Sequence, residues 1–590
     1  MCGIFGYIGP KNNAAQIVHE GLKRLEYRGY DSWGIAVLDK DGIKASKSVG
    51  SIGDVDKKIN LPESVIGIGH TRWATHGGIS ETNAHPHYSS DKSFVLAQNG
   101  IVENYIELKN ELTKKGYEFD SQTDTEVIVR LVEEKLKTST SIREAIMEAF
   151  HDLKGRNTII ALTRDDEIIA ARNGSPLVVG LSGDEIFLSS DTLSFSNVAS
   201  KMIIIDNGQL VYCKKGEIKL YRIDSGKEIK YTVQEIDAVD NVIDKEGFPH
   251  FMLKEIYENP YVIRQITNQN TDDYKDFVKS IKNSENVYTI ASGTAGIAAA
   301  QTAFYLREIA KVHATSLIGA DALEYMDLFT DKDLIIAPSQ SGETADVLEI
   351  LEQAQKKGVK IASYVNMQGS SMSRMSDFKF MSQAGPEVCV MSTKVFTSQV
   401  AWGYFLAKLV AGDKEGAIKN LKMLEVAAEK YLNENENHKK IKDLASKLVK
   451  AKDIFLLGKY QNLNIMREGM VKLIEGTYKH AHAMPAGDLK HYAITLMEKG
   501  VPVIFAVSED VAQFDVINAA NEVKARGATV IGISPIKHES FDFHIEVPDT
   551  GETAAIINII PLQLLSYYMT VELGHNVDKP RNIAKSVTVK

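Results

Sequence analysis

The first third of the chain alternates short apolar segments with turns rich in glycine and aspartate. Residues 4–8, 34–38 and 158–162 are apolar runs of strand length, each bounded by such turns. Helix signals are fewer, but Thr123 is followed by acidic residues and then by apolar residues at helical spacing from Val127 onward. These patterns predict an α+β layered domain with a helix that begins next to Thr123.

Two segments of the second half share one pattern: a strand ending in serine, a helix, a basic residue followed by glycine, and a second strand. The serine and the glycine are 19 positions apart in both segments, at Ser339 and Gly358 and at Ser508 and Gly527. A strand, a loop and a helix precede each segment, at residues 287–303 and 454–472. Strands rich in Ile and Val that alternate with helices predict two tandem α/β domains with parallel sheets, whose ligand sites lie beyond the carboxyl ends of the strands.

The change from one pattern to the other sets the expected domain boundaries. A polar, irregular stretch separates the two halves, and we interpret it as a linker. The predicted parts are a first domain at 1–220, the linker at 221–248, α/β domains at 249–425 and 426–575, and a C-terminal tail at 576–590.

Composition narrows the class of protein. The chain has 590 residues, 44% of them hydrophobic, which is enough for several domains with their own cores. A net charge of −10 without a basic block argues against a nucleic-acid surface. The three cysteines have spacings that suit neither a disulfide framework nor a thiolate metal site, which favours the cytoplasm. We expect no signal peptide and no stretch of about 18 apolar residues that would span a membrane.

Cys2 carries the most chemical information in the first half. Removal of Met1 would leave a thiol and a free α-amine on one residue. An α-amine titrates near pH 8, so it can take the thiol proton at about neutral pH without a neighbouring histidine. The sequence therefore favours an N-terminal nucleophile, with a chance cysteine at position two as the alternative.

Two downstream motifs supply groups that fit an amide substrate. Residues 70–77 place Arg72 among hydroxyls and an aromatic ring, which suits the carboxylate of an amino acid whose ammonium Asp124 could hold. Asn99 and Gly100 follow an apolar strand and offer an amide and a backbone N–H to an oxyanion. Taken alone, the two motifs could be a solvated loop and a hairpin turn.

With Cys2-Gly3-Ile4 and residues 26–32, these motifs resemble the N-terminal-nucleophile glutamine amidotransferases. The resemblance implies glutamine hydrolysis in an αββα fold, with Cys2 as the nucleophile and Asn99 and Gly100 as the oxyanion hole. It implies that Trp73 also gates an internal ammonia channel. The glutamine-binding residues that it implies are Arg72, Trp73, Thr75, His76 and Asp124.

The first α/β repeat carries a candidate phosphate site. Residues 339–344 end a strand and open a helix with three hydroxyls and several backbone N–H groups at the positive end of the helix dipole. Residues 292–294 and 392–394 occupy similar junctions. An ordinary helix cap is the alternative. In the second repeat two carboxylates follow Ser508 and would repel phosphate, so we expect one phosphate site per chain.

Glu468, Lys472 and Glu475 fall on one face of a predicted helix. On spacing alone, an exposed row of salt bridges is the simplest interpretation. Residues 486–491 and 578–590 contain more functional groups than a loop and a chain end usually do.

Along its whole length the chain resembles the isomerising glutamine:fructose-6-phosphate aminotransferase family. The resemblance implies glutamine and fructose 6-phosphate as substrates, glucosamine 6-phosphate and glutamate as products, and the first step of hexosamine synthesis, without metal or organic cofactor. It implies that His491 opens the sugar ring, Lys585 forms an imine with the open-chain ketose, and Glu475 moves a proton between C1 and C2. It further implies a homodimer and a C-terminal tail that closes over the sugar. The implied sugar-phosphate contacts are Thr294, Ser339, Gln340, Ser341, Thr344, Val390, Ser392 and Lys472.

Two departures from the family pattern leave alternatives open. Ala295 stands where the family commonly has a phosphate-binding serine, and Tyr492 follows His491 where glycine is usual. A glutaminase that serves another phosphosugar is one alternative. A phosphosugar-binding regulator with an inert isomerase half is another, and the presence of Lys585 argues against it.

Overall fold

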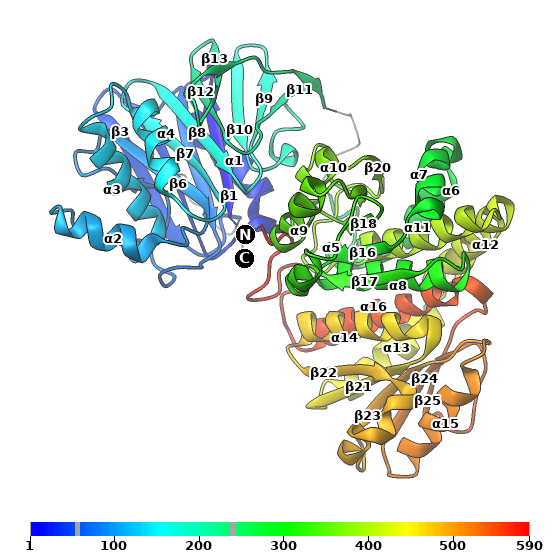
Figure 1. The fold of residues 1–590 in the computed structure, drawn as a ribbon. Coiled ribbons are helices and arrows are strands. Elements are labelled where there is room, and N and C mark those ends of the chain that lie inside the picture. Colours follow the sequence, from blue (N-terminus) through cyan, green and yellow to red (C-terminus); the bar gives the residue numbers. More distant parts are fainter. Residues whose placement is uncertain (1, 54–58, 237–243, 589–590) are drawn as a thin grey trace. The chain divides into compact units, whose positions relative to one another are not determined.

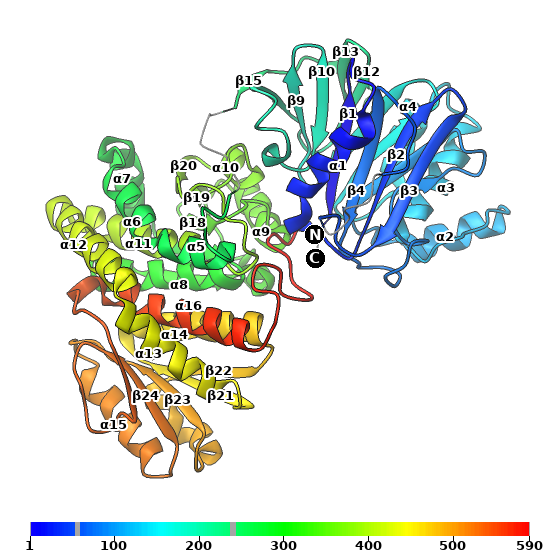
Figure 2. The same cartoon turned by 180° about the vertical axis from the view of Figure 1, so that it is seen from behind.

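The computed structural model describes residues 2–53, 59–236 and 244–588. The chain divides into two compact units, Met1–Val242 together with Ser586–Lys590, and Ile243–Lys585. Figures 1 and 2 show both from opposite sides, and each unit is described by itself.

Two antiparallel sheets stack face to face in the first unit. The first sheet has the strand order β15-β11-β9-β10-β1-β4-β2-β3 and the second β14-β13-β12-β8-β7-β6-β5. Strands of the first are β1 (Gly3–Ile8), β2 (Ser32–Asp39), β3 (Gly42–Val49), β4 (Ile66–Arg72), β9 (Val178–Ser182), β10 (Glu185–Ser189), β11 (Lys201–Ile204) and β15 (Gln234–Glu235). Strands of the second are β5 (His87–Tyr88), β6 (Phe94–Gly100), β7 (Asn157–Thr163), β8 (Glu167–Asn173), β12 (Gln209–Lys214), β13 (Glu217–Arg222) and β14 (Glu228–Ile229).

Helices cover the outer faces of both sheets, which gives the αββα order of layers (Figure 1). The outer face of the first sheet packs against α1 (Ala14–Arg24), and that of the second against α2 (Tyr105–Lys114), α3 (Asp124–Leu136) and α4 (Ile142–Asp152). Fully buried side chains of both sheets, among them Ile4 and Ile160, form the core between the sheets. The predicted α+β layered domain is confirmed.

Helix α3 begins where the sequence predicts. Thr123 lies in extended backbone, and its side chain accepts a hydrogen bond from the backbone N–H of Glu126. This bond satisfies one of the free N–H groups of the first helical turn.

The first unit extends past residue 220, its predicted end. Tyr221 pairs with Leu210 and with Glu228, and Gln234 pairs with Met202. The predicted linker therefore begins too early, because its polar residues lie on edge strands that only pairing with distant partners reveals. Residues 237–243 of that linker lie outside the described residues.

Two parallel five-stranded sheets form the second unit, with strand orders β17-β16-β18-β19-β20 and β22-β21-β23-β24-β25. The first contains β16 (Val287–Ala291), β17 (Ala314–Ile318), β18 (Leu334–Ser339), β19 (Lys360–Val365) and β20 (Phe378–Met381). The second contains β21 (Asp453–Gly458), β22 (His480–Pro485), β23 (Pro502–Ala506), β24 (Thr529–Ser534) and β25 (Phe543–Glu546). Counted along the chain, both sheets have the same topology, which confirms the predicted repeat.

The helices of the second unit are α5 (Phe251–Tyr257), α6 (Asn259–Thr267), α7 (Lys275–Asn283), α8 (Gly293–Glu308), α9 (Ala345–Lys356), α10 (Ser371–Met375), α11 (Lys394–Ala411) and α12 (Lys414–Asn433), followed by α13 (Asn435–Leu448), α14 (Leu463–Thr477), α15 (Gln513–Lys524) and α16 (Ala554–Glu572). The predicted division at 425/426 falls inside α12, which packs against α6, α11 and α16. A helix shared between two packed domains gives no polar break in the sequence.

Helix α16 corrects one expectation from the sequence. The segment Gly551–Glu572 is long and apolar enough to cross a membrane by length and composition alone, although no such stretch was expected. However, 89% of its apolar window is buried inside the protein, against α14 and α13 among others. A helix that is apolar on all sides is expected at the centre of a large core.

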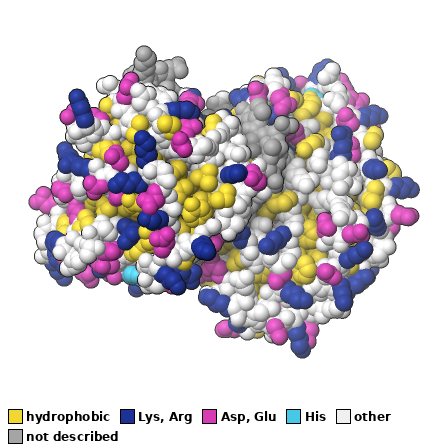
Figure 3. Space-filling model, turned by 90° about the horizontal axis from the view of Figure 1, so that it is seen from above, with side chains coloured by type: hydrophobic (Ala, Val, Ile, Leu, Met, Phe, Trp, Pro, Cys, Tyr) yellow, Lys and Arg dark blue, Asp and Glu magenta, His cyan; other side chains and the backbone are white. Residues whose placement is uncertain are grey.

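Acidic and basic side chains are interspersed over the face of the molecule in Figure 3.

Candidate functional sites

Cys2 lies just before the central strand β1, next to the end of β4. Gly3 pairs with Thr71, and the backbone N–H of Trp73 donates to Cys2 Sγ over 3.3 Å. Burial raises the pKa of the Cys2 thiol, so the free thiol holds its proton at neutral pH. Attack on an amide by this thiol needs a base close to Sγ.

Asn99 and Gly100 lie at the end of β6 and continue its pairing with β7, so the hairpin-turn alternative is wrong. Asn99 Oδ1 lies 3.2 Å from His70 Nε2, and Asn99 Nδ2 donates to Ser190 Oγ over 2.8 Å. Ser190 Oγ also accepts from the N–H of Ile4, 2.9 Å away, which links the amide to the strand that follows Cys2. This network fixes the orientation of the Asn99 amide and leaves its second N–H for another acceptor.

Gly100 has φ +142°, and a Cβ at this position would lie 2.1 Å from the carbonyl oxygen of Arg156. Only glycine fits this backbone path.

The guanidinium of Arg72 holds the loop that follows it. Arg72 Nη2 donates to the carbonyl oxygens of His76 over 2.5 Å and Gly77 over 3.0 Å, and Nη1 donates to that of Gly78 over 3.1 Å. The side chain is buried, so the solvated-loop alternative is wrong for Arg72.

Asp124 is the first residue of α3 and lies near Arg72 and Cys2. Its Oδ2 accepts from the N–H of Val102 over 2.8 Å, and burial raises the pKa of its carboxyl group. His76 packs edge-on against Tyr105, with 4.8 Å between the ring centroids. Thr75 is exposed and Trp73 half-buried on the same loop. The structure thus places Arg72, Trp73 and Asp124 close to Cys2, with Thr75 and His76 on the loop that follows Arg72, and their roles stay predictions.

In the second unit, serine side chains of the predicted phosphate loop, residues 339–344, accept hydrogen bonds from the backbone of the same loop. Ser339 ends β18 and accepts from the N–H of Gly342 over 2.9 Å, and Ser341 Oγ accepts from the N–H of Glu343 over 3.2 Å. Gly342 has φ +64°, and a Cβ there would lie 2.2 Å from Ser370 Oγ. Gln340 is half-buried and accepts at its carbonyl from the N–H of Asn366.

Three helices begin at this edge of the first parallel sheet, and in the described part of the chain none is capped by the side chain of its own N-cap residue. Ser292, Thr344 and Thr393 occupy the N-cap positions of α8, α9 and α11 without a capping hydrogen bond. The hydroxyl groups of Ser292 and Thr393 are buried without a hydrogen-bond partner in this part of the chain. The helix-cap alternative is therefore wrong for these hydroxyl groups, and converging helix N-termini favour an anion.

At the second parallel sheet, side chains of the protein bond to the residues that are equivalent to the predicted phosphate loop. Ser508 Oγ accepts from Asn462 Nδ2 over 2.9 Å and lies 3.3 Å from Asn558 Nδ2. Asp510 accepts from Gln461 Nε2 over 2.8 Å. These contacts support the expectation of one phosphate site per chain.

Glu468, Lys472 and Glu475 form a buried group on α14, so the exposed salt-bridge row is wrong. Lys472 Nζ lies 3.4 Å from Glu468 Oε1 and 2.5 Å from Glu475 Oε2, and the side chains of Glu468 and Lys472 are fully buried. Burial raises the pKa of Glu468 to about 8. The pKa of Lys472 is also raised, because the attraction of the two carboxylates outweighs its burial. Lys472 thus lies between two carboxyl groups, and burial favours the protonated form of the deeper one, Glu468.

This group is joined to the start of α8. Thr294 Oγ1, in the first turn of α8, donates to Glu468 Oε1 over 3.0 Å. A Cβ on Gly476, the residue after Glu475, would lie 3.3 Å from Met391 Sδ, next to Val390 and Ser392. Helix α14 therefore packs against the predicted sugar-binding segment at the residue next to Glu475.

Lys585 is held on that same segment. Its Nζ donates to the carbonyl oxygen of Cys389 over 2.7 Å and to Glu387 Oε2 in a short ion pair. Glu387 also accepts from Ser392 Oγ, 2.8 Å away, and from the N–H groups of Thr393 and Val395. Although burial opposes it, the charge of Lys585 with these hydrogen bonds lowers the pKa of Glu387.

His491 is the predicted residue that the chain does not bring to this group. It is exposed at the end of the 3-10 helix η6 (Ala486–His491), beyond the carboxyl end of β22. Glu475 lies near the end of α14, just before β22 begins. Six strand residues separate these edges of the sheet by roughly 20 Å.

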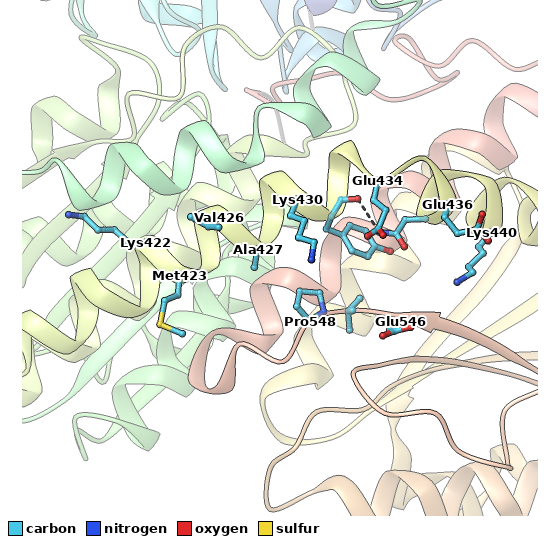
Figure 4. Close-up of a pocket in the computed structure, with 13 residues that line it drawn as sticks. Lys422, Met423, Val426, Ala427, Lys430, Glu434, Glu436, Lys440, Glu546 and Pro548 are labelled. Atoms are coloured by element: carbon cyan, nitrogen blue, oxygen red, sulfur yellow. Dashed lines mark hydrogen bonds between the residues drawn. The ribbon is translucent and has the colours of Figure 1, made fainter.

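A surface hollow of about 770 Å³ lies elsewhere in the second unit (Figure 4). It is lined by α12, α13 and the end of β25, including Val426, Tyr431 and Glu546. It contains none of the predicted site residues.

Sequence reasoning missed Glu387, and it assigned no role to Glu468. Glu387 stands only five positions before Ser392, but a single glutamate in a loop has no periodicity that marks it as buried. Glu468 could have been found from its i, i+4 spacing to Lys472, had the helix been recognised as buried.

The comparisons with known proteins agree with this architecture. The glutamine amidotransferase domain family matches residues 70–197, and the SIS domain family matches residues 280–409 and 447–573. The C-terminal domain of glucosamine-fructose-6-phosphate aminotransferase from Francisella tularensis aligns with a TM-score of 0.52 at 28% identity, covering 57% of this chain and 100% of that one. The chain is thus a glutamine amidotransferase domain followed by two SIS domains.

Curated relatives match over the whole length. The glutamine–fructose-6-phosphate aminotransferases [isomerizing] of Thermococcus kodakarensis and Fusobacterium nucleatum are 38% and 37% identical, and both alignments cover 100% of this chain and of the relative. The chain belongs to the glutamine–fructose-6-phosphate aminotransferase [isomerizing] family.

Proposed function

We propose that this protein transfers the amide nitrogen of glutamine to fructose 6-phosphate and isomerises the product to glucosamine 6-phosphate, releasing glutamate. The observation that carries the proposal is the setting of Lys585. Its amine is held at Cys389 and Glu387, directly beside Val390 and Ser392, in a chain related over its full length to enzymes named for this reaction.

The first unit would hydrolyse glutamine. After removal of Met1, the α-amine of Cys2 takes the thiol proton, and the thiolate attacks the amide carbon. Asn99 Nδ2 and the N–H of Gly100 stabilise the oxyanion, ammonia leaves, and water cleaves the thioester to glutamate. Arg72, Thr75, His76 and Asp124 bind the amino-acid end of glutamine, and Trp73 takes part in binding and gates the passage of ammonia.

The second unit would bind the sugar phosphate where three helices begin. Hydroxyl groups and N–H groups of Ser339, Gln340, Ser341 and Thr344 face the phosphate, and Thr294, Val390 and Ser392 complete the site with Lys472. The N-termini of α8 and α9 support this assignment, because a helix start without a side-chain cap leaves N–H groups for a ligand.

The chemistry at C2 then proceeds through an imine. The neutral Lys585 amine attacks the C2 carbonyl of the open-chain ketose, and water leaves. Ammonia replaces the lysine at C2, and Glu475 moves a proton from C1 to C2, which gives the 2-amino aldehyde. The side chains supply each proton transfer, so the proposal uses no metal or organic cofactor.

Ring opening by His491 points to a homodimer. His491 and Glu475 lie at opposite edges of one sheet, so a second copy would have to supply His491 to this site. The C-terminal tail that carries Lys585 would close over the sugar. We place the reaction in the cytoplasm, as the three unpaired cysteines suggest.

A mass balance tests the proposal. Purified protein receives glutamine and fructose 6-phosphate, and glutamate and glucosamine 6-phosphate are quantified together. Equal amounts of both products are expected. Glutamate without hexosamine would favour a different phosphosugar, with Ala295 as the first residue to examine. Tight phosphosugar binding without turnover of either substrate would favour the regulator.

A further inference from the structure

Glu255 is a buried carboxyl group to which the proposed chemistry assigns no role. It lies on α5 (Phe251–Tyr257) and is only 2% exposed. Its Oε1 accepts two backbone hydrogen bonds, from the N–H of Val388 over 2.5 Å and from that of Cys389 over 3.1 Å. One carboxyl oxygen thus holds two successive residues of a loop.

That loop supplies both acceptors of the Lys585 amine. Glu387 precedes Val388 and accepts through its carboxylate, and Cys389 accepts through its carbonyl oxygen, 2.7 Å from Nζ. The positions of both acceptors follow the path of the backbone at 387–389. The two hydrogen bonds of Glu255 to Val388 and Cys389 fix that path.

The same helix is tied to the C-terminal segment. Asp578 accepts from the N–H groups of Phe251 and Met252 at the start of α5, over 3.0 and 2.9 Å. The carbonyl oxygen of Asp578 accepts from the N–H of Val390 over 3.0 Å. Helix α5 therefore aligns the loop with the segment that carries Lys585.

The second oxygen of Glu255 is unusual. Oε2 is buried without a hydrogen-bond partner among the described residues. Burial and the neighbouring Glu387 raise the pKa of Glu255 to about 8, against the attraction of Lys585 and Lys394. The other ionisable groups around it are Cys389 in the loop and Asp578 in the C-terminal segment. Burial thus favours the protonated form of Glu255 at neutral pH, and Glu387 is the carboxylate in direct contact with Lys585.

We propose that Glu255 is a positioning residue for Lys585: through Val388 and Cys389 it sets the two acceptors that aim the lysine amine at the substrate carbonyl. This inference rests on the proposed function. In the imine step the Lys585 ammonium first gives a proton to Glu387, its contact partner. The nitrogen lone pair then forms the bond to C2, and the carbonyl oxygen leaves as water. A shift of the acceptors misplaces the amine before the bond forms.

The test traps the imine. Fructose 6-phosphate is added with borohydride, whose hydride adds to the imine carbon and leaves a stable secondary amine on Lys585, located by peptide mass spectrometry. Glu255→Ala removes both backbone hydrogen bonds, and Glu255→Gln keeps an oxygen acceptor but cannot ionise. Glu246→Gln is the matched control, because Glu246 is 66% exposed and pairs with Lys254 on the same helix over 2.9 Å.

We expect Glu255→Ala to slow labelling of Lys585 by about tenfold to a hundredfold, while glutamine hydrolysis and the Kd for fructose 6-phosphate stay unchanged. Glu255→Gln and Glu246→Gln should label at the wild-type rate at neutral pH. Above about pH 8, Glu255→Gln should label Lys585 faster than the wild type does. The reason is that an ionised Glu255, present in the wild type only, stabilises the Lys585 ammonium.

The outcomes distinguish failure of the positioning role from failure of the proposed function. If the wild type labels Lys585 and Glu255→Ala labels it equally fast, the positioning role is wrong and the proposed function stands. If Glu255→Ala also loses sugar binding, the Glu255→Gln pH profile decides, and a profile identical to the wild type overturns the inference. If the wild type carries no label on Lys585, the imine step fails and the inference falls with it.

Discussion

Thr294 Oγ1 donates a hydrogen bond to Glu468 Oε1 over 3.0 Å, which joins α8 of the first SIS domain to α14 of the second. The bond connects the helix that begins at the predicted phosphate site with the buried Glu468–Lys472–Glu475 group. Neither SIS domain alone contains both parts. Their packing through α8, α11, α14 and α16 therefore assembles the candidate sugar site.

Thr294→Val should break the hydrogen bond between α8 and Glu468. Valine keeps the shape of threonine but cannot donate to Glu468, and a lost hydrogen bond of this kind costs about 1–2 kcal/mol. Hexosamine formation should fall about tenfold, since about 1.4 kcal/mol corresponds to a factor of ten, while glutamine hydrolysis is retained. Thr302→Val is the control, because the Thr302 hydroxyl donates within α8, to the carbonyl oxygen of Ala298. Equal losses in both variants would contradict a specific role for Thr294.

The buried Glu468 makes stability depend on pH. Its pKa is raised from 4.5 to about 8 in the folded protein, so folding favours the protonated form. The associated stability is complete below about pH 4.5 and is lost as the pH rises towards 8. Thermal unfolding of the second unit should therefore move down by a few degrees across this range. Glu468→Gln should show a smaller shift, with a remainder from Glu255. If the unfolding temperatures of the wild type and of Glu468→Gln change in parallel with pH, Glu468 is ionised in the folded protein.

Gly342→Ala should disturb the phosphate loop. The substitution adds a Cβ 2.2 Å from Ser370 Oγ at a residue with φ +64°. Gly183→Ala is a matched control, because Gly183 has φ +57° with nothing within 4 Å of its Cβ position. Both variants carry about 1–2 kcal/mol of backbone strain, and only Gly342→Ala also has the clash. Calorimetry with fructose 6-phosphate should show a weaker Kd for Gly342→Ala alone. Wild-type affinity in Gly342→Ala would exclude the loop from the site.

Cys2→Ala should abolish the use of glutamine. Loss of a nucleophile removes at least about a thousandfold of rate, as in other nucleophilic enzymes. Isomerisation of fructose 6-phosphate in the second unit should persist, measured as glucose 6-phosphate. Cys213→Ala, at a buried thiol of the core between the sheets, should retain glutamine hydrolysis. Glutamate release that survives in Cys2→Ala would remove this thiol from the mechanism.

Mixed assemblies test whether His491 acts across a homodimer. Lys585→Ala and His491→Ala should each lose hexosamine formation, and Lys585→Ala should keep glutamine hydrolysis. When the two inactive variants are co-expressed, half of the dimers are mixed, and one of their two sites is intact. About a quarter of wild-type activity should return. Activity that never returns would place both residues in a site made by one chain.

Strand and helix patterns along the chain determined the two-part fold. Alternating and continuous apolar runs specify antiparallel layers in one part and parallel sheets in the other, because burial on one or both faces dictates which positions are apolar. The topology 2-1-3-4-5 of both parallel sheets follows the repeat in the sequence. The N-terminus of α3 at Thr123 was readable for a similar reason, since a cap is a local bond. Cys2, Asn99 and Gly100 were found because their chemistry is local to short motifs.

Burial of the charged groups was decided by the tertiary structure. Glu468, Lys472 and Glu475 have the spacing of a surface salt-bridge row, and only the packing of α14 against α16 and α8 removes Glu468 and Lys472 from water. Glu387 and Glu255 bear no periodic mark, yet long-range contacts place them around Lys585, 198 residues after Glu387. Sequence patterns record which positions avoid water, whereas the pKa of a carboxyl group depends on neighbours that only the folded chain brings within a few ångströms.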